Sequence, residues 1–184
     1  GIRIIFFICA LFILIITDAA ITVEKNKYYY IKSTLSGDEN RGYWDLPGGG
    51  GFKKGEVLQL WSYDNGDDRK YMITPAGNGW NYISPKNAAF GRIIRGTVDV
   101  SDRNIKNGSK VHIWNWKLKD NSNQQFKFVD IGGEKYKIYI NRGGGKKILC
   151  AAGNSDANGT AVVPWDDHNS PACYWKLIEA GKAG

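Results

Sequence analysis

Two short stretches of the sequence place a polar side chain beside a tryptophan. His112 precedes Trp114 by two residues, and Gln59 precedes Trp61 at the same spacing. Residues two apart in a β-strand share a face, so each pair would present a hydrogen-bonding group next to an aromatic plate. A sugar has hydroxyl groups and an apolar C–H face, which match an amide or carboxylate beside a ring. Both stretches are therefore candidate carbohydrate-binding surfaces.

The surrounding chain predicts short strands that would hold these pairs. Gly, Asn, Asp and Pro interrupt it at short intervals, and no window keeps a helical period for long. Eight segments combine β-branched or aromatic residues with turn residues at their ends: Tyr28–Ser33, Val57–Trp61, Lys70–Thr74, Lys110–Trp114, Gln125–Val129, Lys135–Ile140, Gly159–Val163 and Tyr174–Glu179. The glycine runs at 48–51 and 143–145 lack the flanking residues of phosphate-binding loops and are interpreted as turns.

The sequence repeats itself three times. A glycine stands six residues before a tryptophan in each copy: Gly55 and Trp61, Gly108 and Trp114, Gly159 and Trp165. Upstream stand Trp44-Asp45-Leu46, Val98-Asp99-Val100 and Leu149-Cys150-Ala151, and downstream an aromatic residue closes each copy, at Tyr71, Phe126 and Trp175. Each unit is too small to bury its own core, so the three should pack around a pseudo-threefold axis.

The middle repeat resembles the ricin-type (R-type) lectin β-trefoil family. The resemblance lies in Asp99, Asn107-Gly108-Ser109, His112-Ile113-Trp114 and Asn123-Gln124-Gln125-Phe126. In place of the family's Gln-x-Trp signature, the third repeat has Ala172-Cys173-Tyr174-Trp175 and the first, more loosely, Asp68-Arg69-Lys70-Tyr71. The resemblance spans residues 27–180 and implies an all-β β-trefoil: a six-stranded barrel, three hairpin caps, and up to one shallow sugar pocket per repeat.

The resemblance also assigns roles in the middle repeat, where the motif is most complete. Asp99 matches the carboxylate that holds the sugar hydroxyls, and Trp114 matches the stacking aromatic residue. Asn123 matches the amide ligand, Gln124 matches the residue that orients the aspartate, and His112 flanks them. This repeat is the first candidate for a working pocket.

The first repeat keeps part of the motif. Asp45, Gln59 and Trp61 match it, whereas Asp68 and Arg69 stand where Asn and Gln are expected. Two interpretations stay open, namely a pocket with altered preference and a structural ion pair between Asp45 and Arg69.

The third repeat loses every hydroxyl ligand of the motif. Cys150 replaces the carboxylate, Val163 the flanking polar residue, and Ala172-Cys173 the Asn-Gln pair. The aspartate and glutamine of an intact pocket lie within hydrogen-bonding reach, so cysteines at both positions would suit a disulfide. We therefore expect a Cys150–Cys173 disulfide in place of a sugar site, and two free buried thiols are the alternative.

The first residues have the pattern of an export signal. Arg3 precedes an apolar run from Ile4 to Ile16, which is too short to span a bilayer as a helix, and Thr17 and Ala19 suit cleavage after Ala19. We expect a signal peptide at 1–19, a short linker at 20–26, the trefoil domain at 27–180 and a tail at 181–184. A retained signal-anchor is the alternative. We expect the chain to be secreted and therefore extracellular.

Charge and composition limit the remaining functions. The net charge is +7, which favours acidic partners, but no block of five or six consecutive Lys and Arg residues occurs. No Ser/His/Asp set, paired carboxylates or metal cluster can be assembled from the repeats, so we expect no enzyme activity, cofactor or metal. The expected partners are glycans, of galactose type by resemblance only, with membranes contacted through glycoconjugates or a retained N-terminal segment. Sulfated polysaccharide or nucleic-acid binding is the alternative, nucleic acid being disfavoured, and a toxin or effector accessory is another.

Overall fold

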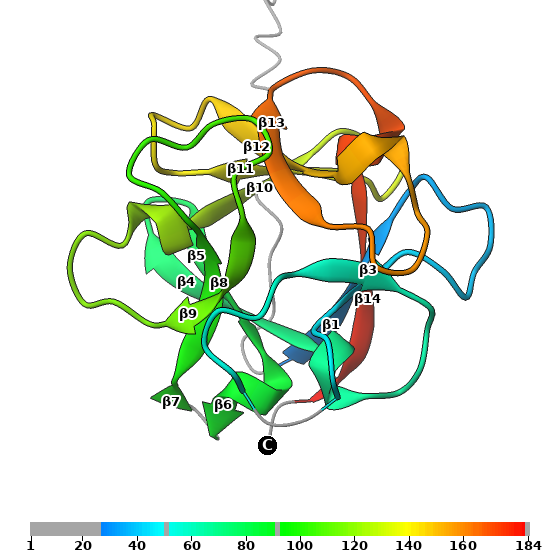
Figure 1. The fold of residues 1–184 in the computed structure, drawn as a ribbon, viewed down its shortest axis with the longest axis horizontal. Coiled ribbons are helices and arrows are strands. Elements are labelled where there is room, and N and C mark those ends of the chain that lie inside the picture. Colours follow the sequence, from blue (N-terminus) through cyan, green and yellow to red (C-terminus); the bar gives the residue numbers. More distant parts are fainter. Residues whose placement is uncertain (1–26, 50–51, 91–92, 183–184) are drawn as a thin grey trace, which may run out of the picture.

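The computed structural model describes residues 27–49, 52–90 and 93–182 (Figure 1). The predicted signal peptide, its signal-anchor alternative and the linker lie outside the described residues. Within them the chain forms strands joined by turns and single-turn 3₁₀-helices, as expected for an all-β protein. No helix in these ranges is long and apolar enough to cross a membrane.

The strands of the described residues are β1 (Lys27–Ser33), β2 (Tyr43–Asp45), β3 (Gln59–Trp61), β4 (Tyr71–Gly77), β5 (Trp80–Pro85), β6 (Ala89–Phe90), β7 (Ile93–Ile94), β8 (Gly96–Val100), β9 (Val111–Asn115), β10 (Phe126–Asp130), β11 (Tyr136–Ile140), β12 (Lys147–Ala151), β13 (Val162–Asp166) and β14 (Trp175–Lys182). The 3₁₀-helices are η1 (Asp67–Arg69), η2 (Lys86–Ala88), η3 (Ser122–Gln124), η4 (Ala152–Asn154) and η5 (Pro171–Cys173).

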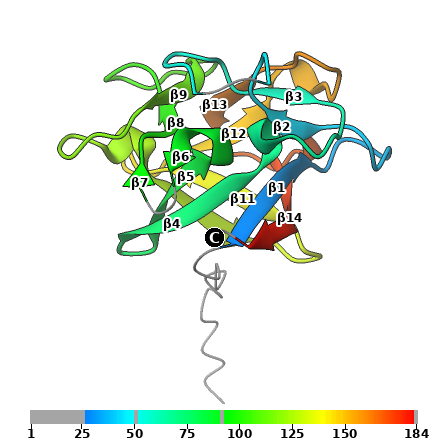
Figure 2. The same ribbon diagram turned by 90° about the horizontal axis from the view of Figure 1, so that it is seen from below.

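Six strands close into a barrel. Antiparallel pairing runs from β1 to β14, β11, β10, β5 and β4, and returns from β4 to β1. Three hairpins, β2–β3, β8–β9 and β12–β13, complete the repeats. Figure 2 shows these hairpins on one side of the molecule and the lower barrel strands β1, β4 and β14 on the other. This is the β-trefoil architecture that the repeat and the resemblance predicted.

The repeat glycines link the three hairpins. The N–H of Gly55 donates to the carbonyl of Ile113 at 2.7 Å, that of Gly108 to Pro164 at 2.9 Å, and that of Gly159 to Leu60 at 2.8 Å. Each acceptor directly precedes the tryptophan of another repeat. All three glycines have positive φ, at 91°, 79° and 87°, a conformation that side chains disfavour. The hydrogen bonds therefore tie each repeat to another in a closed cycle.

The aromatic residue that closes each repeat lies in the core. Tyr71, Phe126 and Trp175 are fully buried, and Trp44 packs edge-on against Tyr71 and Trp175 with ring centroids 5.8 and 5.3 Å apart. The Trp175 indole N–H donates to the Leu149 carbonyl at 2.9 Å, which satisfies its only polar atom. The aromatic residues that close the three units thus form part of the core. The tryptophans that stand six residues after the repeat glycines lie outside it.

Candidate functional site

The hairpins bring the same set of positions together in each repeat. Asp45 faces Gln59 across β2–β3, Asp99 faces His112 across β8–β9, and Cys150 faces Val163 across β12–β13. The helices η1, η3 and η5 then bring the Asp68-Arg69, Asn123-Gln124 and Ala172-Cys173 pairs to these hairpin positions. Each hairpin and its helix define one pocket, and we name the pockets by their repeat.

The middle pocket is centred on Asp99, whose carboxylate contacts four polar side chains. Asn123 Nδ2 donates to Oδ1 at 2.9 Å and His112 Nε2 lies 3.1 Å from it. Gln124 Nε2 donates to Oδ2 at 2.8 Å, as does the Lys117 ammonium at 2.9 Å. Asp99 is only 2% exposed. The structure therefore brings together the predicted Asp99, His112, Asn123 and Gln124, and adds Lys117.

These contacts control the charge of Asp99. Burial alone would raise its pKa, but hydrogen bonds from His112, Lys117 and Gln124, with the positive charge of Lys117, lower the pKa below its ordinary value. An ionised Asp99 can only accept, so Nε2 of His112 carries the proton in this contact. In the neutral ring His112 Nδ1 is then an acceptor, and it has no hydrogen-bond partner among the described groups.

The ring of Trp114 already has polar neighbours. The imidazole of His112 stacks on it with centroids 5.1 Å apart and planes 15° apart, and the Lys54 ammonium lies 4.2 Å from a ring centroid. A ligand that uses the face covered by Lys54 must displace this cation. The pocket has a volume of about 310 Å³, and its rim also carries Arg103 and Asp120.

The sequence reasoning missed both lysines of the middle pocket. Lys117 lies in the loop between β9 and η3, and Lys54 precedes the repeat glycine Gly55. The signal available for Lys117 was its place in the polar connection between the matching motifs at 112–114 and 123–126. Its contact with Asp99 depends on the path of that loop, which the repeat pattern does not define.

The first pocket holds the Asp45 carboxylate between a hydrogen bond from Gln59 and an ion pair with Arg69. Gln59 Nε2 donates to Asp45 Oδ2 at 2.6 Å, and Arg69 Nη2 lies 3.3 Å from Asp45 Oδ1. Oδ1 is buried and accepts no hydrogen bond from the described residues. Arg69 also contacts Asp64 and Asp68, at 2.6 and 3.2 Å. The ion pair expected under one interpretation is thus present, and Oδ1 of Asp45 is contacted by the charge of Arg69 without a hydrogen bond.

The pKa of Asp45 is raised, whereas the pKa of Asp99 is lowered. Burial raises the pKa of Asp45 to about 6, and the hydrogen bond from Gln59 and the charge of Arg69 only partly oppose this effect. The pocket has a volume of about 420 Å³ and includes Trp61, which is 38% exposed. Its floor is therefore a buried carboxyl group and its wall an accessible aromatic plate.

The third pocket has no carboxylate or amide at the equivalent positions. Cys150 and Cys173 form a disulfide in the structure, at the positions that Asp99 and Gln124 hold in the middle repeat. Val163 faces the disulfide, and Trp165 is 44% exposed at the edge of a pocket of about 290 Å³. The predicted disulfide is therefore present at the positions that hold a carboxylate and an amide in the middle repeat.

Comparison with known proteins supports this architecture. A family model described as ricin-type beta-trefoil lectin domain-like matches residues 83–165 and 122–184, which together exceed half of the chain. No curated protein matches the sequence.

Three solved structures illustrate the likeness. The designed threefold-symmetric protein ThreeFoil is 22% identical with a TM-score of 0.70, over 82% of this chain and 97% of that one. A Macrolepiota procera ricin B-like lectin, solved with lactose, is 14% identical with a TM-score of 0.61, over 85% and 97%. The C-terminal half of an earthworm R-type lectin, solved with GalNAc, is 17% identical with a TM-score of 0.58, over 83% and 98%. At these identities the likeness establishes the fold alone.

Proposed function

Because the chain belongs to the ricin-type β-trefoil lectin domain-like family, we propose that it binds carbohydrate through its first and middle pockets, without catalysis. The observation that carries the proposal is the pairing of a buried aspartate with a tryptophan plate in these two repeats. Asp45 lies with Trp61 in one pocket and Asp99 with Trp114 in the other. This combination matches the hydroxyls and the C–H face of a sugar.

The first pocket has an acceptor that a sugar hydroxyl would satisfy. A buried polar atom without a hydrogen bond destabilises a fold by roughly 1–3 kcal/mol. Asp45 Oδ1 accepts no hydrogen bond and has only the ion pair with Arg69, so a ligand hydroxyl that reached it would add the missing hydrogen bond. Gln59 holds the other oxygen in place, and Trp61 would stack on the sugar face. Arg69 would adjust the preference of this pocket without excluding a ligand.

In the middle pocket a sugar would bind by replacing side-chain contacts that are already present. A sugar hydroxyl can reach Asp99 Oδ2 if Lys117 gives up its contact, while Gln124 keeps the carboxylate oriented. Asn123 would hold a second hydroxyl, and Nδ1 of His112 is a further unpartnered acceptor in a residue that lines the pocket. Lys54 would leave the Trp114 ring as the sugar stacks on it. We therefore expect the middle pocket to bind more selectively than the first.

Two relatives in fold support a galactose-type ligand. The earthworm lectin was solved with GalNAc and the Macrolepiota procera lectin with lactose, and both sugars carry a galactose-type ring. The apolar run at 4–16 and the Cys150–Cys173 disulfide support an extracellular, secreted location, since disulfides persist in oxidising compartments.

A glycan array followed by competition with free sugar tests the proposal. We expect binding to galactose-terminated glycans that free galactose or lactose abolishes, and a weaker signal for Asp45→Asn in the first pocket. The control is Glu134→Gln, an exposed acid in the β10–β11 turn, which should bind like the wild type. A folded protein that binds no glycan, or whose binding no free sugar reduces, would contradict the proposal.

Binding of sulfated polysaccharide is a second candidate, favoured by the two lysines of the middle pocket. Lys54 lies over the Trp114 ring and Lys117 contacts the Asp99 carboxylate. The chain also carries a net charge of +7. Affinity for a polyanion falls steeply with salt because counterions are released on binding. Binding that disappears on raising NaCl and resists free galactose would favour this candidate over the neutral sugar.

A further inference from the structure

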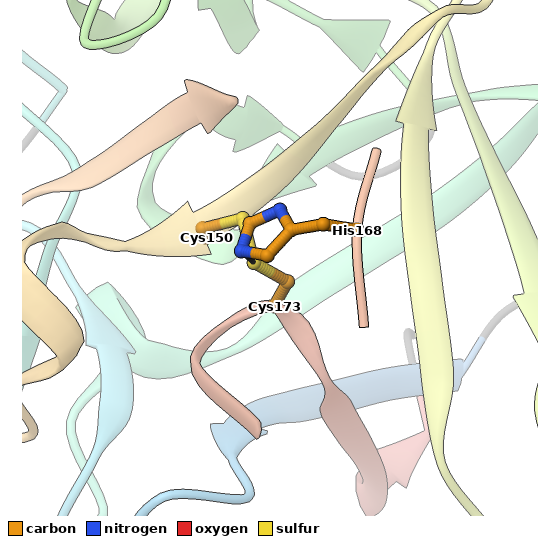
Figure 3. A group of neighbouring side chains, drawn as sticks. All are labelled: Cys150, His168 and Cys173. Carbon is orange, nitrogen blue, oxygen red and sulfur yellow. Dashed lines mark hydrogen bonds between the residues drawn. A yellow bond between two sulfur atoms is a disulfide. The ribbon is translucent and has the colours of Figure 1, made fainter. Parts of the chain in front are cut away.

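The third pocket contains a group of side chains that sugar binding does not use. Figure 3 shows the imidazole of His168 beside the bond between Cys150 and Cys173. His168 Nε2 lies 3.8 Å from Cys173 Sγ, and one ligand atom from each of the three residues falls within 4.8 Å of the others. Two cysteines and one histidine are a donor set that zinc prefers. We propose that the third repeat becomes a zinc site when this disulfide is reduced.

The hydrogen bonding of His168 prepares it to bind a metal. Its Nδ1 lies 2.8 Å from the carbonyl oxygen of Asp166, which can only accept a hydrogen bond. Nδ1 therefore carries the proton, and in the neutral ring Nε2 has a free lone pair directed towards the sulfurs. Metal-bound histidines are commonly oriented in this way, by a carbonyl or carboxylate on the other ring nitrogen.

The distances fit tetrahedral zinc after a small rearrangement. Zn–S bonds of about 2.3 Å and Zn–N bonds of about 2.0 Å place sulfur and nitrogen about 3.5 Å apart, and two sulfurs about 3.8 Å apart. His168 Nε2 is already 3.8 Å from Cys173 Sγ. Once the disulfide is broken, the two sulfurs separate by rotation about their Cα–Cβ bonds.

The surroundings leave one coordination position open. Both cysteines are nearly buried, yet they line the third pocket of about 290 Å³, which gives the metal access and space for a water ligand. The neighbouring carboxylates are engaged elsewhere, Asp166 by Lys147 at 2.7 Å and Asp167 by Lys137 at 2.7 Å. The site would thus hold zinc by three protein ligands and expose the fourth position to solvent.

The chemistry requires a reductant, and a phosphine supplies it. The phosphine loses two electrons and takes an oxygen atom from water as its oxide, while each sulfur gains one electron and one proton. Zn²⁺ then displaces the two thiol protons into the buffer and bonds to both thiolates and to the imidazole nitrogen. Hydrogen peroxide, which takes up two electrons and two protons to form two molecules of water, would oxidise the two thiolates back to the disulfide and release Zn²⁺.

Cobalt titration of the full chain tests the proposal. The protein is reduced with a phosphine without oxygen, freed of reductant and titrated with Co²⁺, which shows sulfur-to-cobalt charge transfer in the near ultraviolet and tetrahedral d–d bands. We expect one equivalent to bind the reduced protein, Zn²⁺ to displace it, and the oxidised protein to show no such bands.

Two variants identify the ligands. His168→Ala removes one of three ligands and should weaken binding by about 100-fold or more, since even the loss of an outer-sphere partner costs 10–100-fold. His112→Ala, at the other histidine of the chain, should leave the affinity unchanged. The same Co²⁺ affinity in His168→Ala as in the wild type would overturn the proposal, as would the absence of charge-transfer bands in the reduced protein.

Thermal unfolding covers the case in which reduction loosens the fold. A metal that binds the folded chain raises its melting temperature by mass action. Zn²⁺ should therefore raise the melting temperature of the reduced wild type but not of Cys150→Ala/Cys173→Ala. Failure of Zn²⁺ to stabilise or refold the reduced chain would also overturn the proposal.

Discussion

The ammonium of Lys117 lies 2.9 Å from Oδ2 of Asp99, whose carboxylate matches the group that holds the sugar hydroxyls in the family motif. The same oxygen accepts from Gln124, so a ligand can gain it only by displacing the lysine. In the first pocket, Oδ1 of Asp45 accepts no hydrogen bond from the described residues. The two pockets therefore share a motif and differ in the side chains that already contact the carboxylate.

Removal of Lys117 should strengthen sugar binding in the middle pocket. In Lys117→Ala the hydroxyl no longer competes with an ammonium, and we expect the affinity for a neutral galactose-type sugar to rise several-fold. Because about a third of this side chain is exposed, the lost ion pair should lower the free energy of unfolding by only about 1 kcal/mol. Isothermal titration in a Trp61→Ala background would isolate the middle pocket.

The matched control for this measurement is Lys119→Ala. Lys119 is an exposed lysine of the same loop, and its removal changes the net charge equally. Equal affinity changes in the two variants would assign the effect to overall charge and contradict a specific role of Lys117.

The ionisation of Asp45 should make stability depend on pH between about 4 and 6. Burial raises its pKa from 3.8 to about 6, so the folded chain holds this proton more tightly than the unfolded chain does. The resulting stabilisation is complete below the unfolded pKa and is lost as the pH rises through about 6. It amounts to up to about 3 kcal/mol.

Denaturant unfolding of wild type and Asp45→Asn from pH 4 to pH 8 measures this contribution. The stability of the wild type relative to the variant should fall across this range. Asp99, whose lowered pKa gives a stabilisation that is lost on acidification, is present in both proteins and cancels in the difference. A difference that does not change with pH would show that Asp45 titrates normally.

The repeat made most of the architecture predictable. Asp99, Asn123 and Gln124 are far apart in sequence, yet the motif placed them in one pocket because each repeat reuses the same hairpin and helix. Strands β2, β5, β8 and β12, and the two-residue β6 and β7, were not among the predicted segments. Three of the five residues of β8 are β-branched, but β8 opens on Gly96 and contains Asp99, and β12 follows a glycine run at 143–145. Pairing with β9 and β13 completes these two strands.

The chemistry of the pockets was less predictable than their positions. Lys54 and Lys117 occupy repeat positions at which the other two copies carry no lysine. The Arg69 guanidinium contacts Oδ1 of Asp45 as an ion pair without a hydrogen bond, and it also contacts Asp64 and Asp68. Such details depend on side-chain packing and burial, and a motif states neither.

The Cys150–Cys173 disulfide should stabilise the fold by roughly 3 kcal/mol, because it closes a loop of 23 residues in the unfolded chain. Replacement of both cysteines by alanine should lower the free energy of unfolding by about this amount and leave sugar binding intact, since neither cysteine lines the first or middle pocket. Mass spectrometry after alkylation without reduction provides the direct check. Two alkylated thiols at these positions would contradict the crosslink.

Substitution of the tryptophans at positions 61, 114 and 165 should separate an effect on binding from an effect on stability. Trp61 and Trp114 share their pockets with a carboxylate, whereas Trp165 faces the disulfide pocket. We expect Trp61→Ala and Trp114→Ala each to reduce binding to a glycan-coated surface well beyond half, because one shallow pocket binds a monosaccharide weakly and two together gain avidity. Trp165→Ala should keep the signal. Because Trp165 is 44% exposed, its loss should lower the free energy of unfolding by only about 1–2 kcal/mol.

Surface plasmon resonance on immobilised glycan measures the binding of all three variants, and denaturant unfolding shows which of them remain folded. The glycan density supplies a further control, because the deficit of the single-pocket variants should shrink when the glycans are too sparse to engage two pockets at once. Equal loss of binding in folded Trp114→Ala and Trp165→Ala would assign these tryptophans to the fold alone. A deficit at every density for Trp61→Ala and none for Trp114→Ala would restrict binding to the first pocket, where Oδ1 of Asp45 accepts no hydrogen bond from the described residues.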